Sequence, residues 1–315
     1  MEPRPLILAG DNDPHVEAVS KHLARRGVAP IYLNFAKLVE VAVTVTIEGQ
    51  FIGETEIGRT TAIWNRRLLP VITPSEMDVK WKRWCEQEFT QAVLGALYCL
   101  KAHWVSDYFH VRRASIKTLQ LKVAHEIGGL NIPEFIVTSN ADDAQKFISK
   151  ICQGDAIVKP LGRPVVSNGD SISTFFTNKI NALGNSDWDT LKYAPCIFQR
   201  LIHKIAEIRV TAVGRRLFAT RIDIESVSDV DYRKIDPYSL PHRPFELPAS
   251  IQIGCLAVCD YFGLRFAAFD FLLDQAGVLH FLEVNPNGQW LWIEEITGQP
   301  ISEAIAEELC TPTTN

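Results

Sequence analysis

The stretch from Phe266 to Glu294 constrains the fold of this chain more than any other, because it reads as a β-hairpin with charged residues inside apolar strands. The runs AAFDFLL and VLHFLEV are rich in β-forming residues, and residues 274–277 between them have turn chemistry. Asp270 interrupts the first run and Glu283 the second. A carboxylate among apolar neighbours needs a cation or a hydrogen-bond donor, so the hairpin indicates a site.

Asn285 follows Glu283 by two positions, so in an extended strand both side chains point to the same face. Together with Asp270 they form a set of hard oxygen ligands, which Mg²⁺ prefers, usually together with nucleotide phosphates and water. The alternative is that these residues are polar positions of an edge strand that faces solvent. The strongly apolar flanks of both carboxylates weigh against that interpretation.

Composition excludes several classes of function. The chain has 315 residues, 47% hydrophobic and 22% charged, which is ordinary for a globular protein with two or three compact units. The net charge is −5 and no basic cluster is interleaved with aromatics, so we expect no nucleic-acid partner. No apolar run is long enough to span a membrane. The odd number of cysteines, seven, favours reduced thiols and a cytoplasmic location, with Cys255 and Cys259 as packing residues.

The first part of the chain begins with a strand, an amphipathic helix and a second strand, which predicts a small parallel sheet. The loop GDNDPH after the first strand lacks both common phosphate-loop patterns, so nucleotide binding is not expected there. Trp64, Arg66 and Arg67 end a later strand, and by physics alone they read as a surface arginine pair beside a packed tryptophan. We expect a helix over residues 77–106 and a short link over residues 107–113.

From residue 114 onward a second alternation of helices and strands follows, and it runs into a strand hairpin turned at Gly214 and then into the opening hairpin. This order resembles the ATP-grasp ligases, and most specifically the graspetide synthetases that macrocyclise ribosomally made peptides, including the microviridin and plesiocin ligases. The matching segments are WNRR, IKTLQLKVAHEIGGLNIPEFIVTSN, VKPL, FQRLIHKIAEIRVTAVG, DYR and FLEVNPNGQWLWIEEITGQPI. The last is the most specific, since generic ATP-grasp enzymes keep the Glu-x-Asn without the Gly-Gln-Trp continuation.

The resemblance implies an α/β and α+β protein with the three-part ATP-grasp fold. Its parts would be an N-terminal α/β domain (residues 1–110), a central lid (111–198) and a C-terminal domain with the metal hairpin (199–315). It also implies ATP and Mg²⁺ as cofactors.

The resemblance further assigns roles to individual residues. The ATP-binding residues would be Lys117, on a helix of the lid, Lys159, the hinge residues Gln199, Arg200, Leu201 and Ile202, then Lys204, Glu207, Arg209 and Asn285. The Mg²⁺ ligands would be Asp270, Glu283 and Asn285. The catalytic residues would be Arg209, which would approach phosphate, and Arg221 and Arg233, which would stabilise the acyl phosphate, with surface ion pairing as the alternative for the last two. The peptide-binding residues would be Trp64, Arg66 and Arg67.

Two positions depart from the family pattern. Arg200 stands where glutamate is common, and Tyr232 stands where tryptophan is common. Since the backbone provides much of the adenine recognition at the hinge, the first change need not abolish binding.

The function implied is ATP-dependent activation of Asp or Glu side chains of a precursor peptide, followed by attack of Thr, Ser or Lys to form an ω-ester or ω-amide ring. The implied partners are this peptide, with its leader and core, and a second copy of the chain in a homodimer. One alternative is a carboxylate–amine ligase that acts on free amino acids or a protein tail. The other is a nucleotide-binding protein without catalysis, against which the metal triad and the lysines weigh.

Overall fold

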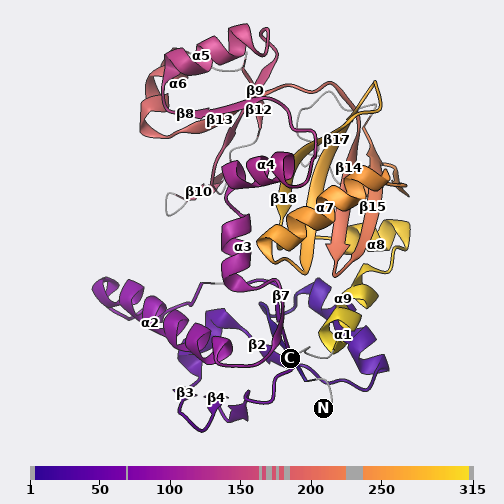
Figure 1. The fold of residues 1–315 in the computed structure, drawn as a ribbon. Helices are drawn as coiled ribbons and strands as arrows, with labels where there is room; N and C mark the ends of the chain where they lie inside the picture. Colours follow the sequence, from indigo (N-terminus) through magenta and orange to yellow (C-terminus); the bar gives the residue numbers. More distant parts are fainter. Residues whose placement is uncertain are drawn as a thin grey trace.

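The computed structural model describes residues 4–68, 70–162, 165–167, 172–174, 177–180, 185–224 and 237–311. Figure 1 shows three sheet-containing parts, with the N-terminal sheet at the bottom, a five-stranded sheet above it on the right and a smaller sheet at the top. The three-part order that the sequence predicts is therefore the order of the sheets, whereas the residue bounds proposed for the domains stay a prediction.

The N-terminal part is a parallel sheet in the strand order β2-β1-β6-β7. Helix α1 ends before Gly27, whose φ of +70° a residue with a side chain would rarely adopt. A small antiparallel sheet, β3-β4-β5, lies between β2 and β6 in the chain. The elements are β1 (Pro5–Leu8), α1 (Pro14–Arg25), β2 (Ile31–Leu33), η1 (Phe35–Glu40), β3 (Val43–Val45), β4 (Gln50–Ile52), β5 (Thr55–Glu56), β6 (Ala62–Asn65), α2 (Val79–Tyr98) and β7 (His103–Val105).

The prediction of one long helix over residues 77–106 is wrong at the C-terminal end of that range. Helix α2 ends at Tyr98, and His103–Val105 forms strand β7, which pairs in parallel with β6. The link expected over residues 107–113 is also wrong, since α3 (Tyr108–Ala114) begins there. Asp107 caps α3 by accepting hydrogen bonds from the backbone of Phe109 at 2.9 Å and His110 at 3.0 Å.

The upper part contains the antiparallel sheet β12-β9-β13-β8 and the separate pair β10-β11. Helix α4, which precedes this part in the chain, packs instead on the five-stranded sheet through Leu121, Val123 and Ala124. The elements are α4 (Lys117–Glu126), β8 (Phe135–Thr138), α5 (Ala141–Lys150), β9 (Ala156–Pro160), β10 (Val165–Ser167), β11 (Ile172–Thr174), β12 (Asn178–Lys179), α6 (Asn185–Thr190), η3 (Leu191–Tyr193) and β13 (Cys196–Arg200).

The C-terminal part is the antiparallel sheet β16-β15-β14-β17-β18. One face packs against α4 and α7, where Cys255 and Cys259 are 0% and 2% exposed, so their expected packing role is confirmed. Burial raises the pKa of Cys259 to about 12. The elements are β14 (Lys204–Val213), β15 (Arg216–Asp223), η5 (Pro237–Ser239), β16 (His242–Pro244), α7 (Ala249–Phe262), β17 (Phe266–Asp274), β18 (Leu279–Asn285), α8 (Leu291–Thr297) and α9 (Ile301–Cys310). Among the described residues, no helix combines the length and apolarity that crossing a membrane requires.

Helix α9 joins the N-terminal part to the five-stranded sheet. Its apolar side lies in one cluster with Val19 of α1, Trp64 of β6 and Val213 of β14. Glu308 adds a polar link, because His103 Nε2 lies 3.0 Å and Arg265 Nη1 3.6 Å from its carboxylate. Burial alone would raise the pKa of Glu308, but the hydrogen bond from His103 and the charge of Arg265 outweigh it and hold the pKa below 4.5.

We therefore predict that Glu308→Gln lowers the free energy of unfolding at neutral pH by about 1–3 kcal/mol, because a charge-assisted hydrogen bond is lost from a mostly buried position. A carboxylate with a depressed pKa contributes stability that is present above its ordinary pKa of 4.5 and is lost as pH falls through the lower folded-state value. The difference in Tm between wild type and variant should thus shrink below pH 4.5. Glu303→Gln, at a more exposed position of α9, is the control, and a pH-independent difference in Tm would contradict the prediction.

Candidate active site

The hairpin of β17 and β18 forms as the sequence predicts. Asp270 pairs directly with Glu283, and the register shifts by one residue immediately after Asp270. The turn at residues 274–277 places Gly277 at φ +79°. Because paired residues of an antiparallel sheet share a face, Asp270 and Glu283 project from the same side, and Asn285 lies on that side through its pairing with Ala268.

These three side chains are in contact. Asn285 Nδ2 lies 3.0 Å from Asp270 Oδ2 and 3.3 Å from Glu283 Oε1, so the amide bridges the two carboxylates. Rotation of the terminal amide by half a turn would present the oxygen in place of the nitrogen. Among the described residues, no three His, Cys, Asp or Glu side chains are grouped so as to hold a metal. A cation here would therefore depend on the two carboxylates, the Asn285 oxygen and a ligand from outside the chain.

Arg209 lies on the same face of the sheet. Its Nη1 is 2.6 Å from Asp270 Oδ1, and its Nη2 donates to the carbonyl of Gln289 at 2.9 Å. The arginine is 8% exposed, so the pair lies in a medium where charge interactions are strong. A Cβ at Gly288 would lie 2.7 Å from Arg209 Nη2 and 2.6 Å from Ala268 Cβ, so this glycine is required for the close approach.

Lys204 and Glu207 begin the same strand, β14. Their side chains form a salt bridge in which each is about 10% exposed, and Glu207 shares the sheet face of Arg209 by alternation. The structure therefore brings together, on one face, Lys204, Glu207, Arg209, Asp270, Glu283 and Asn285.

Arg221 is not part of this group. It pairs with Ile208, whose side chain lies in the core beneath the opposite face of the sheet. Its Nε lies 2.6 Å from Asp223 Oδ1, which is the ion pairing that we considered as its alternative role. Arg233 lies outside the described residues, as does Tyr232.

The two lysines expected to hold phosphates come from different packing units. Lys117 is the first residue of α4, and its Nζ donates to the carbonyl of Pro160 at 3.0 Å. Lys159 directly precedes that proline on β9. The structure therefore places Lys117 next to the strand that bears Lys159, although its helix packs on the five-stranded sheet.

The hinge between β13 and β14 holds Gln199 in an unusual position. This side chain is fully buried, and among the described residues neither its amide oxygen nor its amide nitrogen has a hydrogen-bond partner. A buried amide without partners costs free energy. The backbone of Leu201 donates to the Asp155 carbonyl at 2.9 Å and fixes the chain that follows. Ile202 continues this segment in a half-buried position.

Arg200 turns away from the hinge, which accounts for its departure from the family pattern. Its guanidinium binds both carboxylate oxygens of Glu134, at 2.7 Å and 3.0 Å, and also contacts the Ile151 carbonyl. The hydrogen bonds to Glu134 raise the pKa of Arg200, and those from Arg200 lower the pKa of Glu134. The side chain thus ties β13 to the beginning of β8 and the end of α5.

Trp64 and Arg67 are not brought to the site. Trp64 is 2% exposed and packs in the cluster around α9, and Arg67 is exposed at the end of β6. Their expected contact with a peptide stays a prediction, and core packing explains Trp64.

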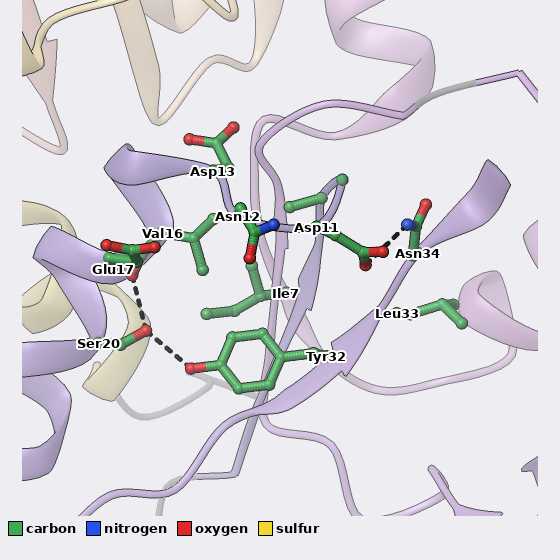
Figure 2. Close-up of a pocket in the computed structure, with 12 residues that line it drawn as sticks. Ile7, Asp11, Asn12, Asp13, Val16, Glu17, Ser20, Tyr32, Leu33 and Asn34 are labelled. Atoms are coloured by element: carbon green, nitrogen blue, oxygen red, sulfur yellow. Dashed lines mark hydrogen bonds between the residues drawn. The ribbon is translucent and has the colours of Figure 1, made fainter. Parts of the chain in front are cut away.

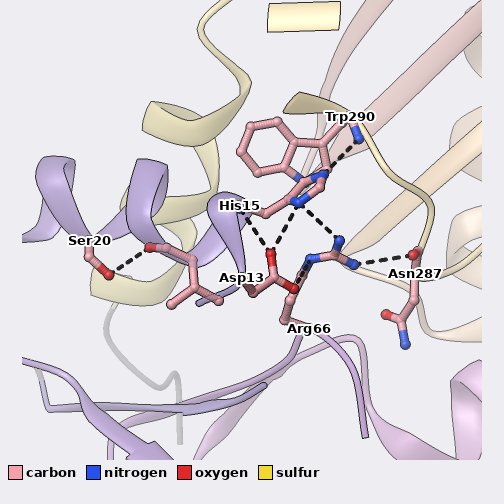
Figure 3. A network of polar contacts seen from close by, with 7 residues as sticks. Asp13, His15, Ser20, Arg66, Asn287 and Trp290 are labelled. Carbon is pink, nitrogen blue, oxygen red and sulfur yellow. Dashed lines mark hydrogen bonds and ion pairs between the residues drawn. The ribbon is translucent and has the colours of Figure 1, made fainter. Parts of the chain in front are cut away.

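Arg66 is buried, at 4% exposed, which differs from the surface position that physics alone predicts. Figure 3 shows its guanidinium between three groups. Nη2 lies 3.1 Å from His15 Nδ1, Nε lies 3.4 Å from Asp13 Oδ2, and Nη1 donates to the Asn287 carbonyl at 3.5 Å. Arg66 therefore links the N-terminal sheet to the segment that follows Asn285.

The same network anchors Trp290. His15 Nε2 accepts from the Trp290 backbone at 3.4 Å, and the two rings meet edge-to-face at 5.1 Å. Burial alone would raise the pKa of Asp13, but the hydrogen bond from His15 and the charge of Arg66 outweigh it, and the pKa is lowered. Sequence reasoning missed Asp13 and His15, since no local pattern links them to residues so far along the chain.

A hollow of about 400 Å³ lies at the carboxyl ends of β1 and β2 (Figure 2). Its polar lining consists of acids, amides and hydroxyls, and includes Asp11, Asn12, Asp13, Glu17, Ser20, Tyr32 and Asn34. Among the described residues that line the hollow there is no lysine or arginine, so it does not suit a phosphate group.

Three solved structures are similar to this chain over nearly its whole length. A RiPP-associated ATP-grasp ligase from Chryseobacterium gregarium, in complex with ADP and a leader and core peptide, has 25% identity and a TM-score of 0.89, with 99% of each chain covered. The macrocyclase MdnC from Microcystis aeruginosa MRC, bound with the precursor peptide MdnA, has 25% identity and a TM-score of 0.85, with 97% of this chain and 98% of that chain covered. The macrocyclase MdnB from the same organism has 28% identity and a TM-score of 0.81, with 98% and 99% covered.

Neither protein-family models nor curated proteins give a match to this sequence. The structural similarity nevertheless confirms the ATP-grasp fold and the resemblance to the RiPP-associated ligases and macrocyclases.

We predict that Gly288→Ala disturbs this face, because the added Cβ would displace either Arg209 Nη2 or Ala268. We expect binding of Mg²⁺–ATP, measured by calorimetry, to weaken at least about 10-fold, as for changes that reorient ligand-supporting groups. Gly95→Ala is the matched control, because nothing lies within 4 Å of its new Cβ. Unchanged affinity in Gly288→Ala would show that Arg209 and its neighbours need not hold their positions.

Proposed function

We propose that this ATP-grasp ligase, whose structure matches those of RiPP-associated ligases and macrocyclases, joins carboxylate side chains of a precursor peptide to nucleophiles of the same peptide. The supporting observation is that one sheet face gathers Asp270, Glu283, Asn285 and Arg209 within a chain that matches a peptide-bound ligase along 99% of its length. The four side chains suit the binding of a nucleotide with its metal ion. The structural match along the whole chain supports a peptide as the substrate.

The residues of the hairpin fit a magnesium ion. Asp270, Glu283 and the Asn285 oxygen would hold it, and the remaining ligands would come from ATP phosphates and water. A bound Mg²⁺ offsets negative charge on the phosphates. This face carries three carboxylates and two cationic side chains, so its formal charge is −1 when all five groups are ionised. The carboxylates are Glu207, Asp270 and Glu283, and the cations are Lys204 and Arg209. A net negative charge favours a divalent cation.

The remaining cations and the hinge would position ATP. Lys117 and Lys159 would contact phosphate oxygens, for which a compact ammonium on a flexible stem is suited. The buried amide of Gln199 and the backbone at Leu201 and Ile202 would face the adenine. Arg200 would act through the geometry of the hinge, since Glu134 occupies its guanidinium.

The reaction follows from the chemistry of a carboxylate. A substrate carboxylate oxygen attacks the γ-phosphorus, and the bond to the β–γ bridging oxygen breaks to release ADP. Arg209 would stabilise charge on the transferring phosphoryl group. A hydroxyl or amine of the peptide then attacks the acyl carbon, loses its proton and displaces inorganic phosphate. The product is an ω-ester or ω-amide, and the same residues would serve either.

The test is incubation of the protein with ATP, Mg²⁺ and synthetic peptides rich in Glu, Asp and Thr, including any such peptide found to be encoded next to it. Loss of one water per bond by mass spectrometry, with ADP release, is the expected result. ADP release with free amino acids alone would favour a carboxylate–amine ligase of another specificity. The absence of ATP turnover with every substrate would favour a nucleotide-binding protein without catalysis.

We predict that Glu283→Gln lowers turnover at least about 100-fold, because the neutral amide removes one of the two carboxylates from the proposed cation site. The Mg²⁺ concentration needed for half-maximal ATP binding should rise as well, which gives a readout separate from activity. Circular dichroism should show a folded protein. Glu126→Gln, on the exposed side of α4, is the control, and retained activity of the Glu283 variant would refute the metal assignment.

A further inference from the structure

The peptide group between Gln289 and Trp290 is held from two opposite sides. Its carbonyl accepts a hydrogen bond from Arg209 Nη2 at 2.9 Å, and its N–H donates to His15 Nε2 at 3.4 Å. A trans peptide group is planar, and its C=O and N–H point in opposite directions. Rotation of this group would therefore disturb both hydrogen bonds together. The orientation of Arg209 is thus coupled to that of His15 through one rigid peptide plane.

His15 can accept a hydrogen bond at Nε2 only if that nitrogen bears no proton. The other ring nitrogen, Nδ1, lies 3.1 Å from Asp13 Oδ1 (Figure 3). Arg66 Nη2 also lies 3.1 Å from Nδ1, but it could donate to Nδ1 only in the tautomer with the proton on Nε2. The tautomer with the proton on Nδ1 satisfies two of these three neighbours, Asp13 and the Trp290 N–H, whereas the other satisfies one.

The surroundings of His15 leave this choice to the protein rather than to water. The histidine is 6% exposed, and its ring meets that of the fully buried Trp290 edge-to-face at 5.1 Å. Burial would raise the pKa of Asp13, but the hydrogen bond from His15 and the charge of Arg66 lower it, so the group is a carboxylate at neutral pH. Asp13 is also the N-cap of α1 and accepts from the His15 backbone at 2.9 Å, which fixes the carboxylate in place.

We propose that Asp13 and His15 are positioning residues of the nucleotide site. Asp13 keeps the proton of the neutral His15 ring on Nδ1. His15 Nε2 then holds the peptide group of Gln289 and Trp290, and the carbonyl of that group keeps Arg209 directed at the phosphates. The role given to Arg209 rests on the proposed function, whereas the tautomer is a property of the protein alone.

The tautomer can be measured directly. In protein labelled with ¹⁵N in its eight histidines, NMR distinguishes a ring nitrogen that bears a proton from one that does not. The signals that vanish in His15→Gln belong to His15. We expect a protonated Nδ1 and an unprotonated Nε2 at neutral pH. A proton on Nε2, in a neutral or a charged ring, would overturn the proposal.

Asp13→Asn tests the part played by the carboxylate. Asparagine caps a helix about as well as aspartate does, so α1 should stay folded. Its amide, however, offers an N–H to Nδ1 in place of a negative charge. We therefore expect the His15 proton to move to Nε2, and the affinity for Mg²⁺–ATP, measured by calorimetry, to fall about 10-fold. A His15 ring that keeps its wild-type tautomer in this variant would rule out control by Asp13.

Two substitutions of His15 differ in where they place an acceptor. A glutamine amide oxygen can reach the position of Nε2, whereas an asparagine reaches only that of Nδ1. We expect His15→Gln to bind Mg²⁺–ATP within about 3-fold of wild type and His15→Asn to bind it about 10-fold more weakly. His22→Asn, further along α1, is the control for the introduced asparagine. Equal affinities in the two His15 variants would show that the acceptor at Nε2 has no role.

Turnover separates this positioning role from the proposed function. With a precursor peptide, His15→Asn should lower kcat about 10-fold and leave the KM for the peptide unchanged, because Arg209 would act on the transferring phosphoryl group. A protein with the expected tautomer and affinities that joins no peptide would refute the proposed function and support the positioning role. Ring formation at the wild-type rate in His15→Asn would refute the positioning role alone.

Discussion

The ion pair between Arg209 and Asp270 is the contact on which the rest of the candidate site depends. It joins the central strand β14 to the hairpin, at 2.6 Å and in a largely buried position. A buried ion pair is stable only when each charged group also has further hydrogen bonds. Here Arg209 donates to the Gln289 carbonyl, and Asp270 accepts from the Asn285 amide. The glycine at position 288 then becomes a steric requirement rather than a free loop residue. The Gly-Gln-Trp continuation of the hairpin is in this way part of the same arrangement as the carboxylates.

The N-terminal part holds this arrangement from the other side. Arg66 contacts the Asn287 carbonyl, and His15 accepts from the backbone of Trp290. In the orientation that satisfies its hydrogen bonds, the Asn287 amide donates to the Asn65 carbonyl at 3.1 Å and to Ser106 Oγ at 3.2 Å. The segment that carries the most specific part of the family resemblance is therefore, in physical terms, a buried junction between two sheets.

Sequence patterns predicted the features of the site that depend on residues close together in the chain. The hairpin, its turn at Gly277 and the shared face of Asp270, Glu283 and Asn285 follow from strand alternation and turn chemistry. The end of α2 could not be predicted in this way. Residues 103–105 form a strand because they pair with β6, which lies far from them in the sequence. Arg200 and Arg66 could not be placed from sequence either. Each is oriented by a carboxylate distant in the chain, Glu134 for the first and Asp13 for the second.

The central claim is that the enzyme activates a peptide carboxylate by phosphorylation, and an oxygen-isotope experiment tests it most directly. A precursor peptide with ¹⁸O in its Glu and Asp carboxylates would be incubated with the protein, Mg²⁺ and unlabelled ATP. If the carboxylate attacks the γ-phosphorus and the nucleophile then attacks the acyl carbon, one labelled oxygen per bond leaves in inorganic phosphate. Ring formation with unlabelled phosphate, or with the label in AMP, would contradict the account.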